Sequence, residues 1–309
     1  MSFLKKMPLT IYGVMVALSS VGNLLASYGD FFKYLCGGCA LLVLILLILR
    51  LIFATKQTKE DLNNPLICSI SPTVSMSIMI LSTYIRPFIP NAAYVIWLAA
   101  IALYVITTIY FIVKFVLHFN IKTVFPSWFA LSAGGVVSSV TCGAFGMQSL
   151  GQVMFYIGFA ASLILFPIVM YRMFKVREVA PPARPTYYIF AAPFNLCLAG
   201  YVGAFAGQFT PVLLYILFAL ALLTLIPCLI SLPFLHKKGF LPAYAGFAFT
   251  TAISAVAMKS VNGALSAMLE KPVPVLGTFV VFMEWLAFVV VFYVFIRYLI
   301  FSFSKPAAA

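Results

Sequence analysis

Charged residues are scarce in this chain of 309 residues. They make up 8% of the sequence, and only 6 residues are Asp or Glu, whereas about 25% of an average soluble protein is charged. Hydrophobic residues reach 64%, well above the usual 45–50% or so. This composition excludes an ordinary soluble globular protein. It predicts one integral membrane domain over residues 1–309.

The alternating apolar and polar pattern of a membrane β-barrel is also missing. Uninterrupted apolar runs dominate instead, as in Ala40–Leu49, which reads ALLVLILLIL. Such runs are typical of membrane-spanning helices, which satisfy their backbone hydrogen bonds internally. The predicted fold class is therefore all-α.

Groups that could bind a metal or carry out catalysis are few. The chain has 2 His and 6 Cys, and the Cys36–Cys39 pair has no further Cys or His nearby to complete a metal site. No His, Asp or Ser–Lys constellation occurs in the predicted spans. We therefore expect no enzyme activity, no metal and no cofactor.

The net charge of +13 comes from 19 Lys and Arg that stand singly or in pairs at the ends of apolar segments. This placement is typical of a membrane protein and does not indicate nucleic-acid binding. Apolar stretches between polar breaks predict ten spans. They cover residues 8–28, 31–54, 65–85, 91–117, 125–143, 150–173, 186–206, 211–235, 241–258 and 274–302.

The basic residues also predict an orientation. Ten spans place both termini on one side, and the loops and ends on that side carry 15 Lys and Arg against 4 on the other. The side richer in Lys and Arg is the cytoplasmic one. We therefore expect both termini in the cytoplasm and a multi-pass protein of the plasma or inner membrane.

The odd-numbered spans each begin near a proline, at Pro8, Pro65, Pro126, Pro185 and Pro242. The spacings are 57, 61, 59 and 57 residues. One proline suits the first turn of any helix, but this regular spacing predicts five repeats of a helical hairpin.

The two helices of each predicted hairpin differ in composition. Odd spans are rich in small and hydroxyl residues, as in Ser132–Gly143, whereas even spans are more apolar, as in Leu213–Ile226. Small residues permit close helix contact, and apolar faces tolerate lipid. We expect an inner ring of five odd helices inside an outer ring of five even helices. An axial pore and a closed, tightly packed core both fit this pattern.

The odd spans contain no Asp, Glu, Lys, Arg or His, which disfavours a proton relay or a tight substrate site on the axis. Glu284, in the tenth span, fits either a structural ion pair with Arg50 or Arg297 or a proton-coupling site. The positive ends of five helices and the basic residues make the cytoplasmic mouth attractive to anions. These features favour an anion channel over a carrier.

Five segments in their order and spacing resemble the tellurite-resistance/dicarboxylate transporter (TDT) family. This family includes bacterial proteins of the TehA type and the plant guard-cell slow anion channels. The segments are Pro8–Met15, Asn64–Pro72, Pro126–Phe129, Ala192–Tyr201 and Gly246–Ser254. The resemblance implies a homotrimer in which each protomer has its own pore, lined by the odd helices.

The resemblance also assigns roles to residues. It implies a gate at Phe249 and helix kinks at Pro72 and Pro193, while Met15 and Leu131 stand where relatives tend to carry further prolines. The candidate pore-lining residues are Gly13, Ser75, Gly135, Asn195, Phe247 and Thr250. For Asn195 an interhelical hydrogen bond is the alternative.

The function expected from the sequence is a gated anion channel. Small anions would pass through a neutral pore that a phenylalanine side chain occludes in each protomer. The alternative is a secondary transporter that exports C4-dicarboxylates or tellurite. A dicarboxylate carrier is expected to hold Arg or Lys near the middle of the membrane, and the odd spans show none.

Overall fold

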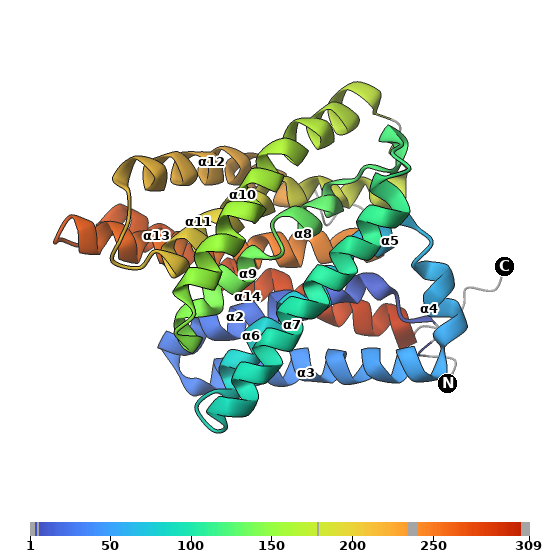
Figure 1. Ribbon diagram of the computed structural model, residues 1–309, viewed down its shortest axis with the longest axis horizontal. Helices are drawn as coiled ribbons and strands as arrows, with labels where there is room; N and C mark the ends of the chain where they lie inside the picture. The colour runs from blue at the N-terminus through green and yellow to red at the C-terminus, as the bar shows by residue number, and fades with distance from the viewer. Residues whose placement is uncertain (1–3, 5, 178, 234–239, 304–309) are drawn as a thin grey trace.

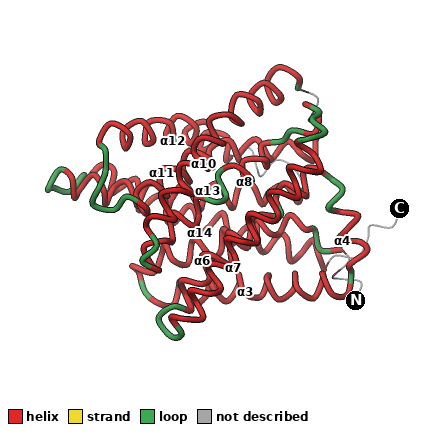
Figure 2. The backbone as a smooth tube through the Cα atoms, in the orientation of Figure 1, coloured by secondary structure: helices red, strands yellow, loops and turns green. Residues whose placement is uncertain are grey.

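The computed structural model describes residues 4, 6–177, 179–233 and 240–303, and these residues form helices and short connections without any strand. Most helices run along the long axis of the molecule, while α7 (Pro90–Phe111) and α10 (Gln148–Met170) cross it obliquely (Figures 1 and 2). The chain is therefore an all-helical, multi-pass membrane protein.

Five segments of mixed helix type correspond to the odd spans, and we call them the central segments. The first is Leu9–Tyr28 (η1 Leu9–Ile11, α2 Tyr12–Leu24 and η2 Leu25–Tyr28), and the second is Pro65–Ile85 (α5 Pro65–Ile70 and α6 Pro72–Ile85). The third is Pro126–Phe145 (η5 Pro126–Trp128, α8 Phe129–Ser132, α9 Val136–Thr141 and η6 Cys142–Phe145). The last two are Pro181–Ala204 (η8 Pro181–Ala191 and α11 Ala192–Ala204) and Pro242–Met268 (η10 Pro242–Tyr244 and α13 Ala245–Met268).

One long helix follows each of them, and we call these five the outer helices. They are α3 (Asp30–Phe53), α7 with a π-helical end at Ile112–Val116, α10 with a π-helical end at Tyr171–Val176, α12 (Pro211–Ser231) and α14 (Pro274–Phe303). The predicted eighth span reaches residue 235, but residues 234 and 235 lie outside the described residues, as do Lys5, Lys237, Lys238 and Lys305.

Eight helical stretches in the described part of the chain are long and apolar enough to cross a membrane. Two further helical stretches, Pro126–Ser132 and Val136–Phe145, are bent by 54° relative to each other. If this pair forms one span, the number of candidate spans is nine. Helix α13 has 24 residues but is not among these candidates, because its small and polar residues lower its hydropathy. The count of ten spans stays a prediction.

Burial separates the two sets of helices. In three central segments 67–89% of the most apolar window is buried, against 22–39% in the five outer helices. The contacts follow a closed order, because α2 packs against α6, α6 against α9, α9 against α11, α11 against α13, and α13 against α2. Each central segment also packs against the outer helix that follows it.

Local sequence explains where several of these elements begin and bend. Proline occupies the first turn of α5, where Asn64 caps the helix by accepting a hydrogen bond from the Leu66 amide. Gly29 connects the first two spans at φ 138°, a conformation that residues with a side chain rarely adopt. A Cβ on Gly134 would lie 2.1 Å from the Ala130 carbonyl oxygen, so only glycine fits the bend.

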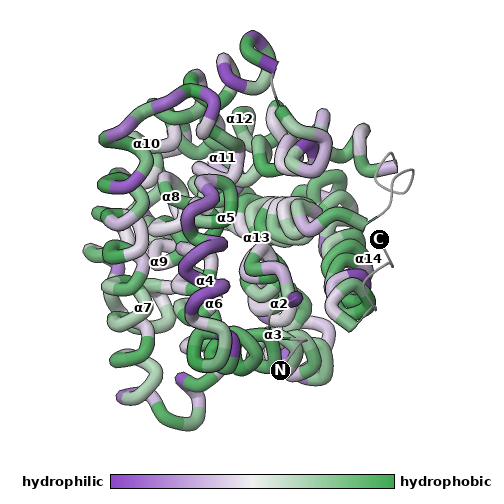
Figure 3. Tube along the Cα trace, turned by 90° about the vertical axis from the view of Figure 1, so that its right-hand side faces the viewer, coloured by the Kyte–Doolittle hydropathy of each residue, from purple (hydrophilic) through white to green (hydrophobic). Residues whose placement is uncertain are grey.

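Two features differ from the expected span boundaries. A short helix, α4 (Thr55–Asp61), lies between the first two hairpins and stands out as a hydrophilic stretch at one end of the molecule (Figure 3). The predicted ninth span ends at residue 258, but α13 continues to Met268. The prediction stopped too early because Lys259 and Asn262 look like a polar break, although Val261, Ala264 and Leu265 continue the buried face.

Candidate functional site

A small cavity lies near the start of the central segments. Its volume is about 20 Å³, which is room for about one water molecule. All five central segments contribute to its wall. The lining residues are Gly13, Ile70, Thr73, Ser127, Ala130, Ile189, Ala245, Gly246 and Phe249.

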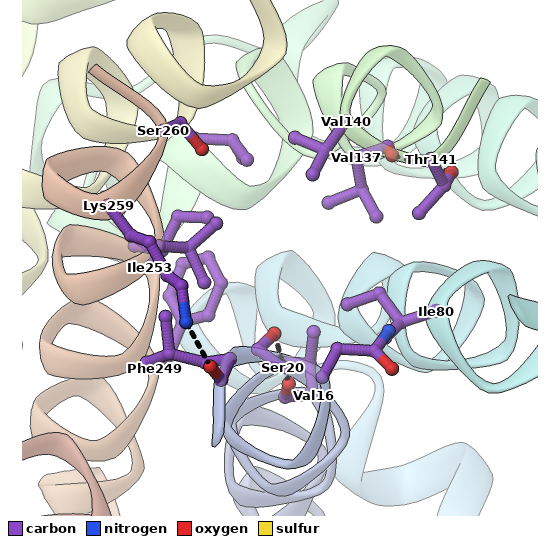
Figure 4. Close-up of a pocket in the computed structure, with 14 residues that line it drawn as sticks. Val16, Ser20, Ile80, Val137, Val140, Thr141, Phe249, Ile253, Lys259 and Ser260 are labelled. Carbon is purple, nitrogen blue, oxygen red and sulfur yellow. Dashed lines mark hydrogen bonds between the residues drawn. The ribbon is translucent and has the colours of Figure 1, made fainter. Parts of the chain in front are cut away.

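A second cavity, of about 220 Å³, lies further along the same segments (Figure 4). The lining residues are Val16, Ser20, Asn23, Leu24, Ile80, Val137, Val140, Thr141, Leu196, Phe249, Ile253, Val256, Lys259 and Ser260. Every one of them belongs to a central segment, and all five central segments are again represented.

Phe249 lies between the two cavities. It belongs to the linings of both, and the residue is only 7% exposed. Ile253, Val256 and Ser260 follow it on α13 at spacings of four, seven and eleven residues, which place them on one helix face. One face of α13 therefore runs along the larger cavity and presents an aromatic ring at its narrow end.

The walls of both cavities are mostly neutral. In the smaller cavity the Thr73 hydroxyl donates to the Ile70 carbonyl oxygen, and the Ser127 hydroxyl lies 2.6 Å from that of Ser69. In the larger cavity the Ser20 hydroxyl donates to the Val16 carbonyl oxygen. Lys259 is the one charged side chain among the residues that line either cavity.

Of the predicted pore-lining residues, Gly13 lies on the smaller cavity and Gly135 lies elsewhere. A Cβ on Gly135 would approach Met154 Cε at 2.7 Å and Tyr104 Cε1 at 2.8 Å. That face of Gly135 is therefore directed at the outer helices α10 and α7, where glycine permits close packing. Ser75 is fully buried and belongs to neither lining.

Asn195 is fully buried in α11 and also belongs to neither lining. Its side-chain nitrogen donates to the Ala191 carbonyl oxygen at 2.8 Å and to the Ala221 carbonyl oxygen of α12 at 3.2 Å. The amide nitrogen thus makes the interhelical hydrogen bond that was the alternative to a pore-lining role.

Phe247 and Thr250 flank the gate candidate on α13 but do not line the two cavities. The Phe247 ring packs against the rings of Tyr188 and Tyr244. Thr250 is buried, and its hydroxyl oxygen has no hydrogen-bond partner among the described residues. These two residues point to different neighbours from Phe249 because consecutive helix positions are about 100° apart.

The two predicted kink prolines lie at breaks in the central segments. Pro72 begins α6 directly after Ser71, which follows the end of α5. Pro193 lies in the first turn of α11, where the preceding 3₁₀ helix η8 ends at Ala191. Proline lacks the backbone N–H that would continue the hydrogen bonds of the preceding helix.

Glu284 has a partner that the sequence did not suggest. Its Oε1 lies 2.8 Å from Lys259 Nζ, and its Oε2 accepts a hydrogen bond from the Tyr28 hydroxyl at 2.7 Å. The expectation of Arg50 or Arg297 as partner is wrong, because Arg50 pairs with Asp61 and the Arg297 guanidinium lies over the rings of Phe240 and Tyr293.

Sequence reasoning missed Ile253 and Lys259 as cavity residues. A helix extended from Phe249 at four- and seven-residue steps would have indicated Ile253 and Val256. The predicted ninth span ends one residue before Lys259 and so places this residue in a loop. The sequence signal for a longer helix is that Val261, Ala264 and Leu265 continue the apolar spacing of a helix beyond Ala257.

Comparison with protein families adds an independent result. The model of the SLAC1 family, described as voltage-dependent anion channel, matches residues 6–299. Comparison with curated proteins gave no match. Because the family match spans nearly the whole chain and includes all five central segments, the protein belongs to the SLAC1 family of voltage-dependent anion channels.

Proposed function

We propose that this protein is a gated channel through which small anions pass along the axis of the central segments, with Phe249 as the gate. The family match supports anion transport in general. The observation that carries the finer proposal is that Phe249 lines both cavities, each of which is walled by all five central segments.

The ring of Phe249 would close the path in two ways. It fills the space between the cavities, and its apolar surface disfavours water and therefore a hydrated ion. The smaller cavity leaves no room for an ion with its water shell beside the ring, since its volume is about 20 Å³. Opening then requires the ring to move away from the path.

The path is suited to anions because of the field at its ends. On the proposed topology all five central segments start at the cytoplasmic mouth, where each helix N-terminus carries about half a positive charge. An inside-negative potential then drives anions outward by about 2.3 kcal/mol per charge per 100 mV. Neutral walls let anions leave quickly, as conduction requires.

The proposed architecture has ten spans as five hairpin repeats, with the central segments as an inner ring and the outer helices around them. The closed order of contacts among α2, α6, α9, α11 and α13 supports this arrangement. We further propose a homotrimer in the plasma or inner membrane with both termini cytoplasmic. Mass determination in native detergent complexes tests the trimer.

Planar-bilayer recording of purified Phe249→Ala protein tests the gate. Removing the ring is expected to raise chloride current more than about tenfold, because each 1.4 kcal/mol or so taken from a barrier changes a rate tenfold. The reversal potential in a chloride gradient should follow the anion. Phe247→Ala is the matched control and should change the current far less, because Phe247 lies on another face of α13 and lines neither cavity.

An unchanged current in properly folded Phe249→Ala protein would contradict the gate. A reversal potential that follows the cation would contradict anion selectivity. A saturable flux of a C4-dicarboxylate or tellurite, too slow to be seen as current, would favour the alternative transporter.

A further inference from the structure

Lys259 brings a positive charge to the larger cavity. It lies on α13 ten residues beyond Phe249, which is about 15 Å along the helix axis. Its Nζ donates to the Leu24 carbonyl oxygen at 2.7 Å (Figure 4). It also donates to the Ser27 hydroxyl at 2.8 Å and forms an ion pair with Glu284. The ammonium is therefore held at the end of the cavity where α2 ends.

The two members of the ion pair differ in exposure. The side chain of Lys259 is 38% exposed and lines the cavity, whereas that of Glu284 is 3% exposed and belongs to the outer helix α14. The Tyr28 hydroxyl holds the second carboxylate oxygen. An anion in the cavity would thus approach the positive end of the pair first, with the negative end behind it.

We propose that Lys259 forms a binding site for small monovalent inorganic anions, such as chloride or nitrate, in the larger cavity, and that Glu284 is a positioning residue that weakens this site. The proposal rests on the proposed channel function. It adds an anion site on the side of Phe249 opposite to the helix N-termini.

The pairing explains how a cation can stand beside a conduction path. An unpaired ammonium next to a narrow path would hold an anion strongly and slow its exit, and conduction needs binding that is weak enough to reverse. The buried carboxylate of Glu284 offsets part of the attraction while Lys259 stays at the cavity wall. The other polar residues of this lining, Ser20, Asn23, Thr141 and Ser260, are neutral.

The same arrangement favours one negative charge over two. A dicarboxylate is recognised best by two cationic groups or by a bidentate one, and this lining supplies a single, partly neutralised ammonium. Malate should therefore compete with chloride no better than a second monovalent anion does.

The experiment measures current against chloride concentration in the Phe249→Ala background, where the gate does not limit the signal. Lys259→Gln should raise the half-saturating chloride concentration about fivefold, the order expected for one partly exposed charge. Glu284→Gln should lower it by a similar factor and reduce the maximal current. Lys271→Gln is the matched control, because Lys271 is exposed on the loop after α13 and belongs to neither cavity lining.

A charge-switching measurement avoids dependence on the folding of separate variants. Lys259→Cys in the same background is treated with a positively or a negatively charged methanethiosulfonate reagent. The positive adduct should restore the parent's current at low chloride, and the negative one should suppress it further. The parent, treated identically, controls for reaction at the six native cysteines.

The outcomes separate the two proposals. Absence of anion current in folded Phe249→Ala protein would contradict the channel itself. Normal current with a half-saturating concentration unchanged in Lys259→Gln, or changed in the same direction by both Lys259→Gln and Glu284→Gln, would overturn the anion site alone. Tighter competition by malate than by nitrate would overturn the monovalent preference.

Discussion

The two sides of Phe249 are built from the same five segments but differ in size and charge. Toward the starts of the segments lies the cavity of about 20 Å³, which is lined mostly by glycine, alanine, isoleucine and hydroxyl residues. On the other side lies the cavity of about 220 Å³, whose lining includes Lys259. On the proposed channel function, the smaller cavity would exclude ions and the larger cavity would collect them, with the Phe249 ring between the two.

The largest effect is expected on the narrow side. A Cβ on Gly13 would lie 3.1 Å from Ala245 Cβ, so Gly13→Val fills space that is already closely packed. Gly13 lines the cavity of about 20 Å³, so the added methyl groups would narrow the proposed path there. Each increase of about 1.4 kcal/mol in the barrier to an ion lowers its rate tenfold, and the current of the Phe249→Ala channel should fall about tenfold or more. Bilayer recording measures it, with Gly13→Ala as an intermediate step.

The matched control for Gly13 is Gly38, because a Cβ there would meet no heavy atom within 4 Å. Gly38→Val should leave the current unchanged. Equal currents in the Gly13→Val and Gly38→Val channels would show that the narrow side does not limit conduction, and the contrast between the two sides would fail.

The second prediction separates ion pairs that touch the path from those that do not. Arg50, with a side chain 2% exposed, lies near the end of α3 and pairs with Asp61, the last residue of α4. Neither residue lines either cavity. Asp61→Asn leaves the buried guanidinium without its counter-charge and should destabilise the fold by about 1–3 kcal/mol, less than for a fully buried pair.

Thermal unfolding in detergent measures this loss, and Glu60→Gln at the exposed neighbouring position is the control. Half-saturating chloride in the Phe249→Ala background should not change with Asp61→Asn, in contrast to Glu284→Gln. A shift of similar size in both variants would mean that the two ion pairs influence the path alike.

The smallest effect is expected on the wide side. Ile253 lines the larger cavity and is 4% exposed. Ile253→Ala enlarges a space that already exceeds the narrow cavity, so the Phe249→Ala current should change less than about twofold, well under 1 kcal/mol of barrier. A rise in current as large as the rise that Phe249→Ala itself produces would mean that Ile253 forms the constriction.

Much of the fold followed from the sequence because the bilayer restricts what a chain can do. Apolar runs of membrane-spanning length must be helical, and the small residues of the odd spans were expected to pack inside. This expectation agrees with the burial of the helices, because 89% of the apolar window in Leu9–Tyr28 is buried but only 22% of that in Pro211–Ser231. The predicted ends of the spans were less accurate. In α13, Lys259 suggests the end of a membrane span as long as its ion-pair partner Glu284 is unknown.

The candidate site was less predictable, since the residues that line a cavity depend on helix rotation. Phe249 and Gly13 were singled out through family resemblance and do lie at cavities, whereas Gly135 and Asn195 face outer helices. The segments that carry these residues contain glycines, alanines and hydroxyls on several faces. Their hydrophobic pattern therefore gives little information about which face is turned to the axis.

The sequence by itself determined that this is a helical membrane protein with an inner and an outer class of helix, because hydropathy and residue size are properties of single segments. Only the tertiary structure decided that Phe249 separates two cavities and that Lys259 meets Glu284. Those relations join residues from different helices, and they depend on the rotation, bending and length that packing imposes on each helix.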